Sequence, residues 1–206
     1  MVLMGRRSAK GSDLVESYAI CRDITKAAST SFLRSFRHLP LEKRNAVYAL
    51  YAFCRRVDDI ADGDWLPDLS DIGPEKMSDL EARTADRSVI LSIDKQSEGS
   101  NSEPDHSLKL RALIHYRDML SRAHEGHSVS DPIFVALKDT FSRFPIRVGD
   151  LHQLIDGMED DLYPTNYRSF EDLRGYCYKV ASTVGLALIE IYGYDNPDAR
   201  EHAEEM

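Results

Sequence analysis

The chain has 206 residues, of which 42% are hydrophobic. This is enough for one domain with a sizeable core, and the chain is too short for two domains of ordinary size. With 35 acidic and 26 basic residues the formal net charge is -9, which disfavours non-specific nucleic-acid binding, so no nucleic-acid partner is expected. An acidic protein can still bind an anionic substrate through divalent cations, because the ions invert the local charge.

Cysteine usage and hydropathy indicate the cellular compartment and the relation of the chain to membranes. Cys21, Cys54 and Cys177 are far apart and lie outside any C-x-x-C pattern, so neither a disulfide framework nor a zinc site is indicated. We therefore expect a reducing, cytoplasmic setting. The first residues lack the apolar run of a signal peptide, and no apolar stretch of about 18 residues could span a bilayer. The chain is expected to be soluble or at most peripheral to a membrane.

The first half of the chain contains two helical patterns. Residues 12–38 carry a mixed helical pattern, and Pro40 marks a break after it. The next pattern, over 41–62, is more regular, because its apolar residues recur at spacings of three and four. These apolar residues are Val47, Leu50, Cys54, Val57 and Ala61. We predict an amphipathic helix over 41–62.

Residues 64–106 predict an acidic and largely irregular excursion, because acidic residues outnumber basic ones and Gly, Pro and Ser recur. We expect a short helix around 78–93 within it. Helical periodicity resumes over 108–123. Asp131 and Pro132 then provide an N-cap and a first-turn proline for a helix through Phe144.

Two further helices are predicted at the end of the sequence. The first runs from about 147 to 161, and the second runs from 169 to 192. Ser169 followed by Asp172 resembles a capping box that would begin the second helix. Alternating Val- and Ile-rich strands are absent and no solenoid repeat is visible, so the predicted fold class is all-α.

One polar stripe on the helix over 41–62 could carry chemistry. At about 100° per residue, Tyr51, Arg55, Asp58 and Asp62 lie within roughly 60° of arc. The apolar residues occupy the adjacent arc, so the stripe borders the buried face. This is the position expected for the wall of a cleft.

Carboxylates one helical turn apart repel each other unless a positive charge lies between them. Arg55 could supply that charge. A magnesium ion could also supply it, because magnesium accepts oxygens from one or two carboxylates together with substrate phosphates. Asp59 points about 80° away from the stripe and is the weaker ligand candidate. The alternative is a solvated acidic last turn that pairs with Arg55 and Arg56.

Four separate blocks carry a family resemblance. They are SxSF at Ser29–Phe32, LPLEKRNAVYALYAFCRRVDDIADG at Leu39–Gly63, LIDGMEDDL at Leu154–Leu162 and YCYKVASTVG at Tyr176–Gly185. In order and spacing the sequence resembles the squalene and phytoene synthase family over roughly residues 15–200. The resemblance implies an all-α, isoprenoid-synthase-type helical bundle, present here as a single partial domain over 1–206 that the excursion at 64–106 interrupts.

The resemblance implies a magnesium-dependent prenyltransferase. Members of the family condense two prenyl diphosphates, farnesyl or geranylgeranyl, head to head through a cyclopropylcarbinyl diphosphate. The products are squalene, dehydrosqualene or phytoene, and the sequence does not decide between C30 and C40. NADPH is expected only if the product is squalene. Substrates this apolar leave peripheral membrane contact open.

The resemblance also assigns roles to residues. Asp58 and Asp62 match the first aspartate-rich magnesium site, with Asp59 as a weaker third ligand, and Tyr51 and Arg55 match catalytic contacts to diphosphate or intermediate. The remaining substrate-binding candidates are Ser29, Ser31 and Phe32 for diphosphate, and Tyr176, Val180, Ala181, Val184 and Gly185 for the hydrocarbon channel. The segment 156–161 is expected to have a mainly structural or flanking role.

The resemblance stops before a second aspartate-rich motif. The last residues, EHAEEM, resemble the segment that precedes that motif, so we expect its aspartates and the C-terminal helices of the fold to be missing. The chain is then a fragment, an inactive truncation, or half of a site that a second polypeptide completes. The alternative function is a non-catalytic helical protein of isoprenoid-synthase ancestry. A helical phosphohydrolase ranks last, because the histidines are poorly placed for one.

Overall fold

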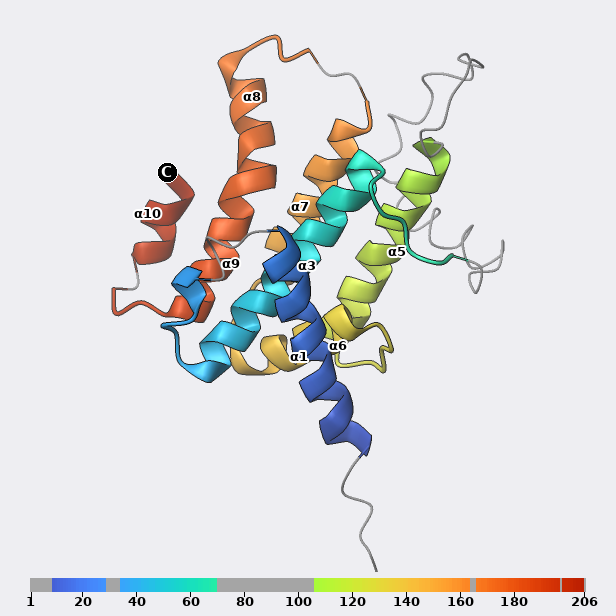
Figure 1. Cartoon of the computed structure of the whole chain (residues 1–206). Coiled ribbons are helices and arrows are strands. Elements are labelled where there is room, and N and C mark those ends of the chain that lie inside the picture. The colour runs from blue at the N-terminus through green and yellow to red at the C-terminus, as the bar shows by residue number, and fades with distance from the viewer. Residues whose placement is uncertain (1–8, 29–33, 70–105, 164–165, 197, 206) are drawn as a thin grey trace, which may run out of the picture.

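A computed structural model describes residues 9–28, 34–69, 106–163, 166–196 and 198–205. Within these ranges the regular structure is helical (Figure 1), and the predicted all-α class is confirmed. Most of the predicted excursion at 64–106, with its short helix over 78–93, lies outside the described residues. The candidates Ser29, Ser31 and Phe32 lie outside them too.

The helices follow the predicted order closely. They are α1 (Ala9–Ala28), α3 (Leu41–Asp62), α5 (His106–His124), α6 (Pro132–Arg143), α7 (Val148–Asp161), α8 (Phe170–Cys177), the π-helical turn η2 (Tyr178–Ser182), α9 (Thr183–Tyr192) and α10 (Ala199–Glu205). The pattern over 12–38 does not form one helix, because α1 ends at Ala28. No helix was predicted where α10 lies.

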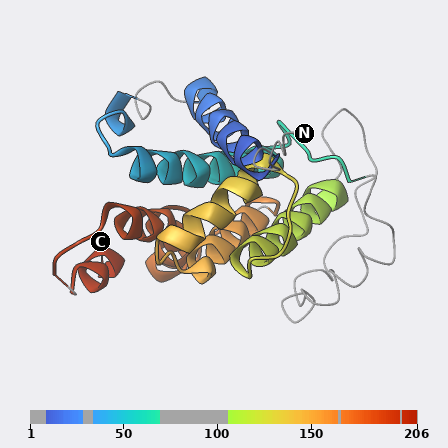
Figure 2. The ribbon, with the colours of Figure 1, turned by 90° about the horizontal axis from the view of Figure 1, so that it is seen from below.

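Helix α3 is the central element of the bundle. It packs against α1, α5, α6, α7 and α9. Figure 2 shows it running between α1 on one side and α5, α6 and α7 on the other. Its buried apolar residues fit this position, because they cover one broad side of the helix. The polar stripe therefore lies on a helix that other helices hold in place on several sides.

An aromatic cluster fills the core beside α3. Phe53 of α3, Tyr116 of α5 and Phe134 of α6 are almost completely buried. Their ring centroids lie 5.0 to 6.4 Å apart, a range in which offset and edge-to-face contacts stabilise the fold beyond area burial. These contacts fix α5 and α6 against α3.

The predicted caps are present. The Asp131 side chain accepts a hydrogen bond of 2.8 Å from the backbone N–H of Ile133 at the start of α6. Ser169 and Asp172 form a reciprocal capping box at the start of α8. Such caps satisfy N–H groups that have no partner within their helix, and each contributes about 1 kcal/mol.

The predicted helix over 169–192 is not continuous. It is interrupted at η2, where the Thr183 backbone N–H donates to the carbonyl of Tyr178, five residues earlier. The Thr183 hydroxyl donates at 2.7 Å to the carbonyl of Lys179, which an α-helix would pair with the Thr183 N–H. The Thr183 hydroxyl thus replaces the Thr183 N–H as the hydrogen-bond donor to the Lys179 carbonyl. Hydrophobic periodicity does not reveal this local exchange.

Candidate functional site

The polar stripe lies on one side of α3 near its C-terminal end. Tyr51, Arg55 and Asp58 are half-buried and Asp62 is exposed, so the stripe runs from the edge of the core into solvent. The Arg55 guanidinium donates to Asp58 at 2.9 Å and pairs with Asp59 at 2.6 Å. Arg55 therefore pairs with the adjacent residues Asp58 and Asp59, whereas the sequence pattern suggested a charge between Asp58 and Asp62.

Asp59 differs from its neighbours because it is buried. Only 6% of Asp59 is exposed, and it pairs with Arg55 through one carboxylate oxygen and with Arg56 through the other, at 3.1 Å. The Arg56 guanidinium in turn lies 4.5 Å from the ring centre of Trp65. Both oxygens of Asp59 are engaged within the protein, so Asp58 and Asp62 are the better placed candidates for a metal ion.

The end of α3 is held in place from outside the helix. Gly63 adopts a left-handed conformation at φ 86°, and its N–H contacts the carbonyls of Asp59 and Ile60. The buried Lys109 ammonium of α5 donates to the carbonyls of Ala61 and Asp62 at 3.0 and 3.2 Å. The last four carbonyls of α3 are thus satisfied. Sequence reasoning missed Lys109, although a lysine between two leucines in a helical pattern is a signal for it.

The end of α7 presents a second acidic group. Asp161 accepts a hydrogen bond of 3.0 Å from the Tyr176 hydroxyl, and Asp160 pairs with the Lys179 ammonium at 2.6 Å. One turn earlier, Asp156 pairs with Arg117 of α5 at 2.7 Å. Asp156 is buried, which agrees with the structural role expected for it.

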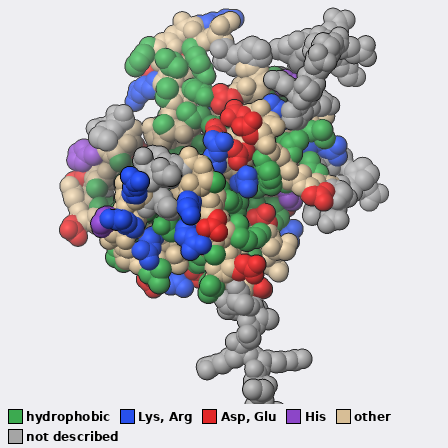
Figure 3. Space-filling model, in the orientation of Figure 1, with side chains coloured by type: hydrophobic (Ala, Val, Ile, Leu, Met, Phe, Trp, Pro, Cys, Tyr) green, Lys and Arg blue, Asp and Glu red, His purple; other side chains and the backbone are tan. Residues whose placement is uncertain are grey.

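Electrostatic coupling connects the two acidic groups. Burial raises the pKa of the Asp58 carboxyl, and the negative charges of Asp62, Asp59 and Asp161 raise it further, whereas Arg55 lowers it. Asp161 is thus the α7 carboxylate that contributes to the raised pKa of Asp58, and α7 packs against α3. Figure 3 shows acidic side chains gathered near the ends of α3 and α7, with lysine and arginine side chains beside them. A divalent cation would relieve this repulsion.

An open pocket of about 470 Å³ lies between α1 and α3, next to the stripe. Its lining combines an apolar wall with charged groups of α3. The lining residues are Ile20, Asp23, Ile24, Ala27, Ala28, Arg55, Arg56 and Asp59. Arg55 belongs both to the stripe and to this pocket, where the carboxylates of Asp23 and Asp59 balance the charges of Arg55 and Arg56.

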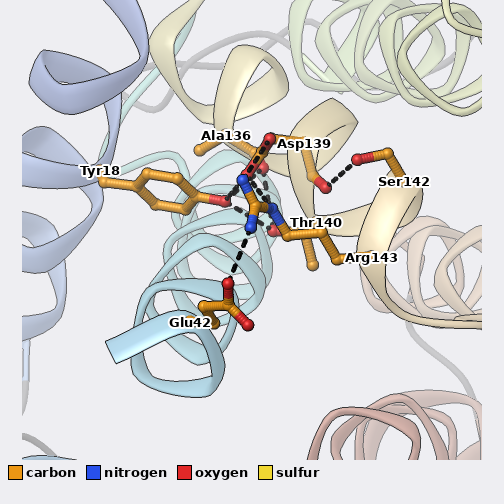
Figure 4. Close-up of polar contacts among 7 residues, drawn as sticks. All are labelled: Tyr18, Glu42, Ala136, Asp139, Thr140, Ser142 and Arg143. Atoms are coloured by element: carbon orange, nitrogen blue, oxygen red, sulfur yellow. Dashed lines mark hydrogen bonds and ion pairs between the residues drawn. The ribbon is translucent and has the colours of Figure 1, made fainter. Parts of the chain in front are cut away.

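A polar network fixes the α1 wall of the pocket (Figure 4). The Tyr18 hydroxyl of α1 donates to Asp139 of α6 at 2.8 Å, and Arg143 donates to the same carboxylate. Arg143 also contacts Glu42 in the first turn of α3 at 3.1 Å. Burial and the neighbouring Asp139 raise the pKa of the Tyr18 phenol, so it remains a hydrogen-bond donor at neutral pH.

The five residues predicted to line a hydrocarbon channel lie on α8, η2 and α9. Tyr176, Val180 and Val184 are half-buried, whereas Ala181 and Gly185 are exposed. Burial and the hydrogen bond to Asp161 raise the pKa of the Tyr176 phenol. Among the predicted channel residues, Tyr176 is thus the one that the structure brings to an acidic group near the stripe.

The donor set of the stripe fits magnesium. Two carboxylates one turn apart supply hard oxygen ligands, and magnesium commonly uses one or two carboxylates together with substrate oxygens. In the described part of the chain no cluster of three or more His, Cys, Asp or Glu side chains could hold a metal on its own. A metal at Asp58 and Asp62 would therefore need ligand or water oxygens to complete its coordination.

A family model described as squalene/phytoene synthase matches residues 25–206. The chain belongs to the squalene/phytoene synthase family. The stripe of α3, the acidic end of α7 and the helical run from α8 to α9 all fall within the matched residues. Sequence resemblance and family match thus agree over the same segments.

Named relatives and solved structures agree with the family. The chain is 31% identical to a phytoene synthase of Arthrospira platensis, over 89% of this chain and 46% of the relative. It is 29% identical to a phytoene synthase of Mycobacterium tuberculosis, over 95% of this chain and 51% of the relative. The chain spans about half the length of the curated relatives it matches.

The fold is likewise shared with solved members of the family. A dehydrosqualene synthase crystal structure in complex with a ligand matches 96% of this chain and 54% of its own, with 26% identity and a TM-score of 0.65. The squalene synthase HpnC from Alicyclobacillus acidocaldarius has the same fold, at 23% identity and a TM-score of 0.64. The predicted isoprenoid-synthase-type bundle is therefore confirmed.

Proposed function

We propose that this chain carries one wall of the active site of a magnesium-dependent prenyltransferase, within a single, partial isoprenoid-synthase domain over 1–206. Its reaction would join two farnesyl or geranylgeranyl diphosphates head to head. Relatives named phytoene synthase and dehydrosqualene synthase support this reaction class. The observation that carries the proposal is the stripe of Tyr51, Arg55, Asp58 and Asp62 beside a pocket with an apolar wall.

The proposed reaction begins with cleavage of the carbon–oxygen bond of one substrate, which releases diphosphate and leaves an allylic cation. That cation bonds to the second prenyl diphosphate, and loss of a proton gives the cyclopropylcarbinyl diphosphate. Cleavage of the second carbon–oxygen bond and rearrangement follow. Loss of a proton from the final cation would give a phytoene- or dehydrosqualene-type product. If the product is squalene, NADPH would supply a hydride instead.

Each residue of the stripe has a physical role in this scheme. Asp58 and Asp62 would hold magnesium, which when bound neutralises diphosphate and makes it a better leaving group. Arg55 would bind diphosphate oxygens from the pocket side, as a fixed positive charge whose interaction strengthens when charge develops on the leaving group. Tyr51 would present a half-buried ring close to the cation.

The first test is diphosphate release by the 206-residue chain with geranylgeranyl or farnesyl diphosphate. Incubations contain magnesium or EDTA, with and without NADPH, and extracted hydrocarbons are identified by mass spectrometry. We expect a magnesium-dependent product, and we expect Asp58→Ala and Asp62→Ala each to lower its formation by roughly 100-fold or more. Glu201→Ala is the matched control, because Glu201 is an exposed carboxylate on α10, outside the stripe and the pocket lining.

The product mass distinguishes C30 from C40, and the NADPH arm distinguishes squalene from the other products. A folded chain that forms no product and binds no prenyl diphosphate in the presence of magnesium would favour the non-catalytic reading. The exposed positions of Ala181 and Gly185 are the observation that favours this second candidate, because a working hydrocarbon channel must exclude water. A second polypeptide that completes the site stays a prediction.

The cellular location of the protein is also a proposal. The described residues form no helix that is long and apolar enough to cross a bilayer. We propose a cytoplasmic protein that contacts membranes peripherally, because prenyl chains partition into lipid. The three cysteines are free.

A further inference from the structure

Gly157 marks the closest approach between α7 and the π-turn η2. A Cβ atom placed at Gly157 would lie 2.6 Å from Cγ1 of Val180 and 3.1 Å from Cβ of Lys179. The first separation is too short for two carbon atoms, so any side chain here would force the two elements apart. Val180 is β-branched and stiff at χ1, and it cannot rotate away without strain.

The same approach brings two side chains to the end of α7. The Lys179 ammonium reaches Asp160 at 2.6 Å, and the Tyr176 hydroxyl reaches Asp161 at 3.0 Å. Neighbouring aspartates of α7 thus bind residues that lie on either side of the boundary between α8 and η2. Both aspartates lie at the end of α7, which packs against α3, the helix that carries the stripe.

The π-turn makes the approach geometrically specific. A π-turn inserts one extra residue relative to an α-helix, which rotates the residues before it by about 100° against those after it. Thr183 stabilises the turn through its hydroxyl bond to the Lys179 carbonyl. Gly157 then allows the turn to lie directly against α7. Both Gly157 and Thr183 are buried, so we expect them to act through the side chains that their contact positions, Tyr176 and Lys179.

We propose that Gly157 is a positioning residue: its contact with Val180 sets how η2 lies on α7 and thereby holds the Tyr176 hydroxyl on Asp161 at the end of α7. The positioning itself is a property of the fold. Its importance for diphosphate chemistry rests on the proposed function. A methyl group at Gly157 should displace η2 and lengthen or break the Tyr176–Asp161 bond.

The test is a double-mutant cycle on the 206-residue chain. The variants are Gly157→Ala, Val180→Ala and the combination of the two. Because Val180→Ala removes the Cγ1 atom that the new methyl would meet, the cost of Gly157→Ala should be large beside valine and small in the double variant. Gly149→Ala is the matched control, because Gly149 lies in the same helix and a Cβ atom there would meet nothing within 4 Å.

Two readouts are used, and neither requires catalysis. The melting temperature of Gly157→Ala should fall by roughly 3 to 10 °C, as expected for overpacking in a chain of this size. The second readout is the Tyr176 resonance in NMR spectra of protein with isotope-labelled tyrosine, assigned by its disappearance in Tyr176→Phe. The chemical shift of the Tyr176 resonance should change in Gly157→Ala and return to the parent value in the double variant. It should be unchanged in Gly149→Ala.

The cycle can contradict the inference directly. If Gly157→Ala folds and leaves the Tyr176 resonance unmoved, or if Val180→Ala does not reduce the effect of Gly157→Ala, then Gly157 does not position Tyr176. If Gly157→Ala does not fold, restored folding in the double variant supports the contact, and continued failure to fold overturns it.

Diphosphate release separates this inference from the proposed function. If the mutant cycle shows the expected coupling but the chain releases no diphosphate, Gly157 positions Tyr176 and the proposed function is rejected. Magnesium-dependent release that is equal in the parent chain and in Gly157→Ala upholds the function and rejects the role of the positioning in it.

Discussion

Adjacent aspartates on α3 occupy very different surroundings. Asp58 is half-buried near other carboxylates, whereas Asp59 is buried between Arg55 and Arg56. The helical angle predicts that the two side chains point in different directions. It does not predict that Asp59 is the buried one, because burial depends on which other elements pack against that side of α3. Local geometry therefore identified the stripe and the two arginines of the same helix, and tertiary packing decided which carboxylate is buried.

We expect Asp58→Asn and Asp59→Asn to change stability in opposite directions. The pKa of Asp58 is raised in the folded chain, so its ionised form destabilises the fold at neutral pH, and this cost disappears as the pH falls through the folded pKa. Asp58→Asn should raise the metal-free melting temperature by about 1 to 3 °C, a modest effect because the side chain is half exposed. It should also weaken magnesium binding.

Asp59→Asn should lower the melting temperature by roughly 4 °C or more, because it leaves two arginines without their buried carboxylate. Thermal unfolding in EDTA, followed by circular dichroism, measures both variants, and magnesium titration by calorimetry measures binding. A fall in stability for Asp58→Asn comparable to that for Asp59→Asn would contradict the assignment of different roles.

Helix ends were well predicted where a side chain caps its own helix. Asp131, Ser169 and Asp172 are local signals, and their helices begin where the caps indicate. The end of α3 depends instead on Lys109, which lies 47 residues further along the chain than Asp62. The π-turn is another such case, since its hydrogen-bond exchange at Thr183 leaves the hydrophobic pattern unchanged. A sequence pattern can mark an unusual lysine, but it does not show which distant helix end that lysine caps or where such a π-turn forms.

Lys109→Met should destabilise the chain by about 2 to 3 kcal/mol, because two carbonyls at the end of α3 lose a charged donor. Lys109→Arg should recover part of the loss, since it keeps the charge but changes the geometry. Urea unfolding measures both variants. Equal stability of Lys109→Met and the parent chain would show that solvent can replace the ammonium.

Helix α10 shows how the whole molecule is joined by charge as well as by apolar burial. Arg200 is buried and pairs with Asp150 of α7 at 2.7 Å and with Glu190 of α9 at 2.8 Å. The anchor of α10 is thus an arginine in a short polar segment, which explains why periodicity did not predict this helix. The larger helices, which bury apolar faces, were all predicted.

Arg200→Met should cost about 3 to 5 kcal/mol at neutral pH, because two buried carboxylates lose their counter-charge. Arg200→Lys should recover part of the loss, because it keeps the positive charge but lacks the planar guanidinium that reaches both carboxylates. Chemical unfolding of the parent chain and of both variants at neutral pH measures the difference. Equal stability of Arg200→Lys and Arg200→Met would mean that packing of the arginine, and not its charge, holds α10.

Trp65 is the only tryptophan of the sequence. Its ring lies beneath the Arg56 guanidinium, and its backbone N–H donates to the carbonyl of Asp59 at 3.2 Å. Indole emission is sensitive to nearby charge, so the protein carries one built-in optical probe at the end of α3. Binding of a cation or diphosphate at the stripe can therefore be followed by intrinsic fluorescence, without a label and without turnover.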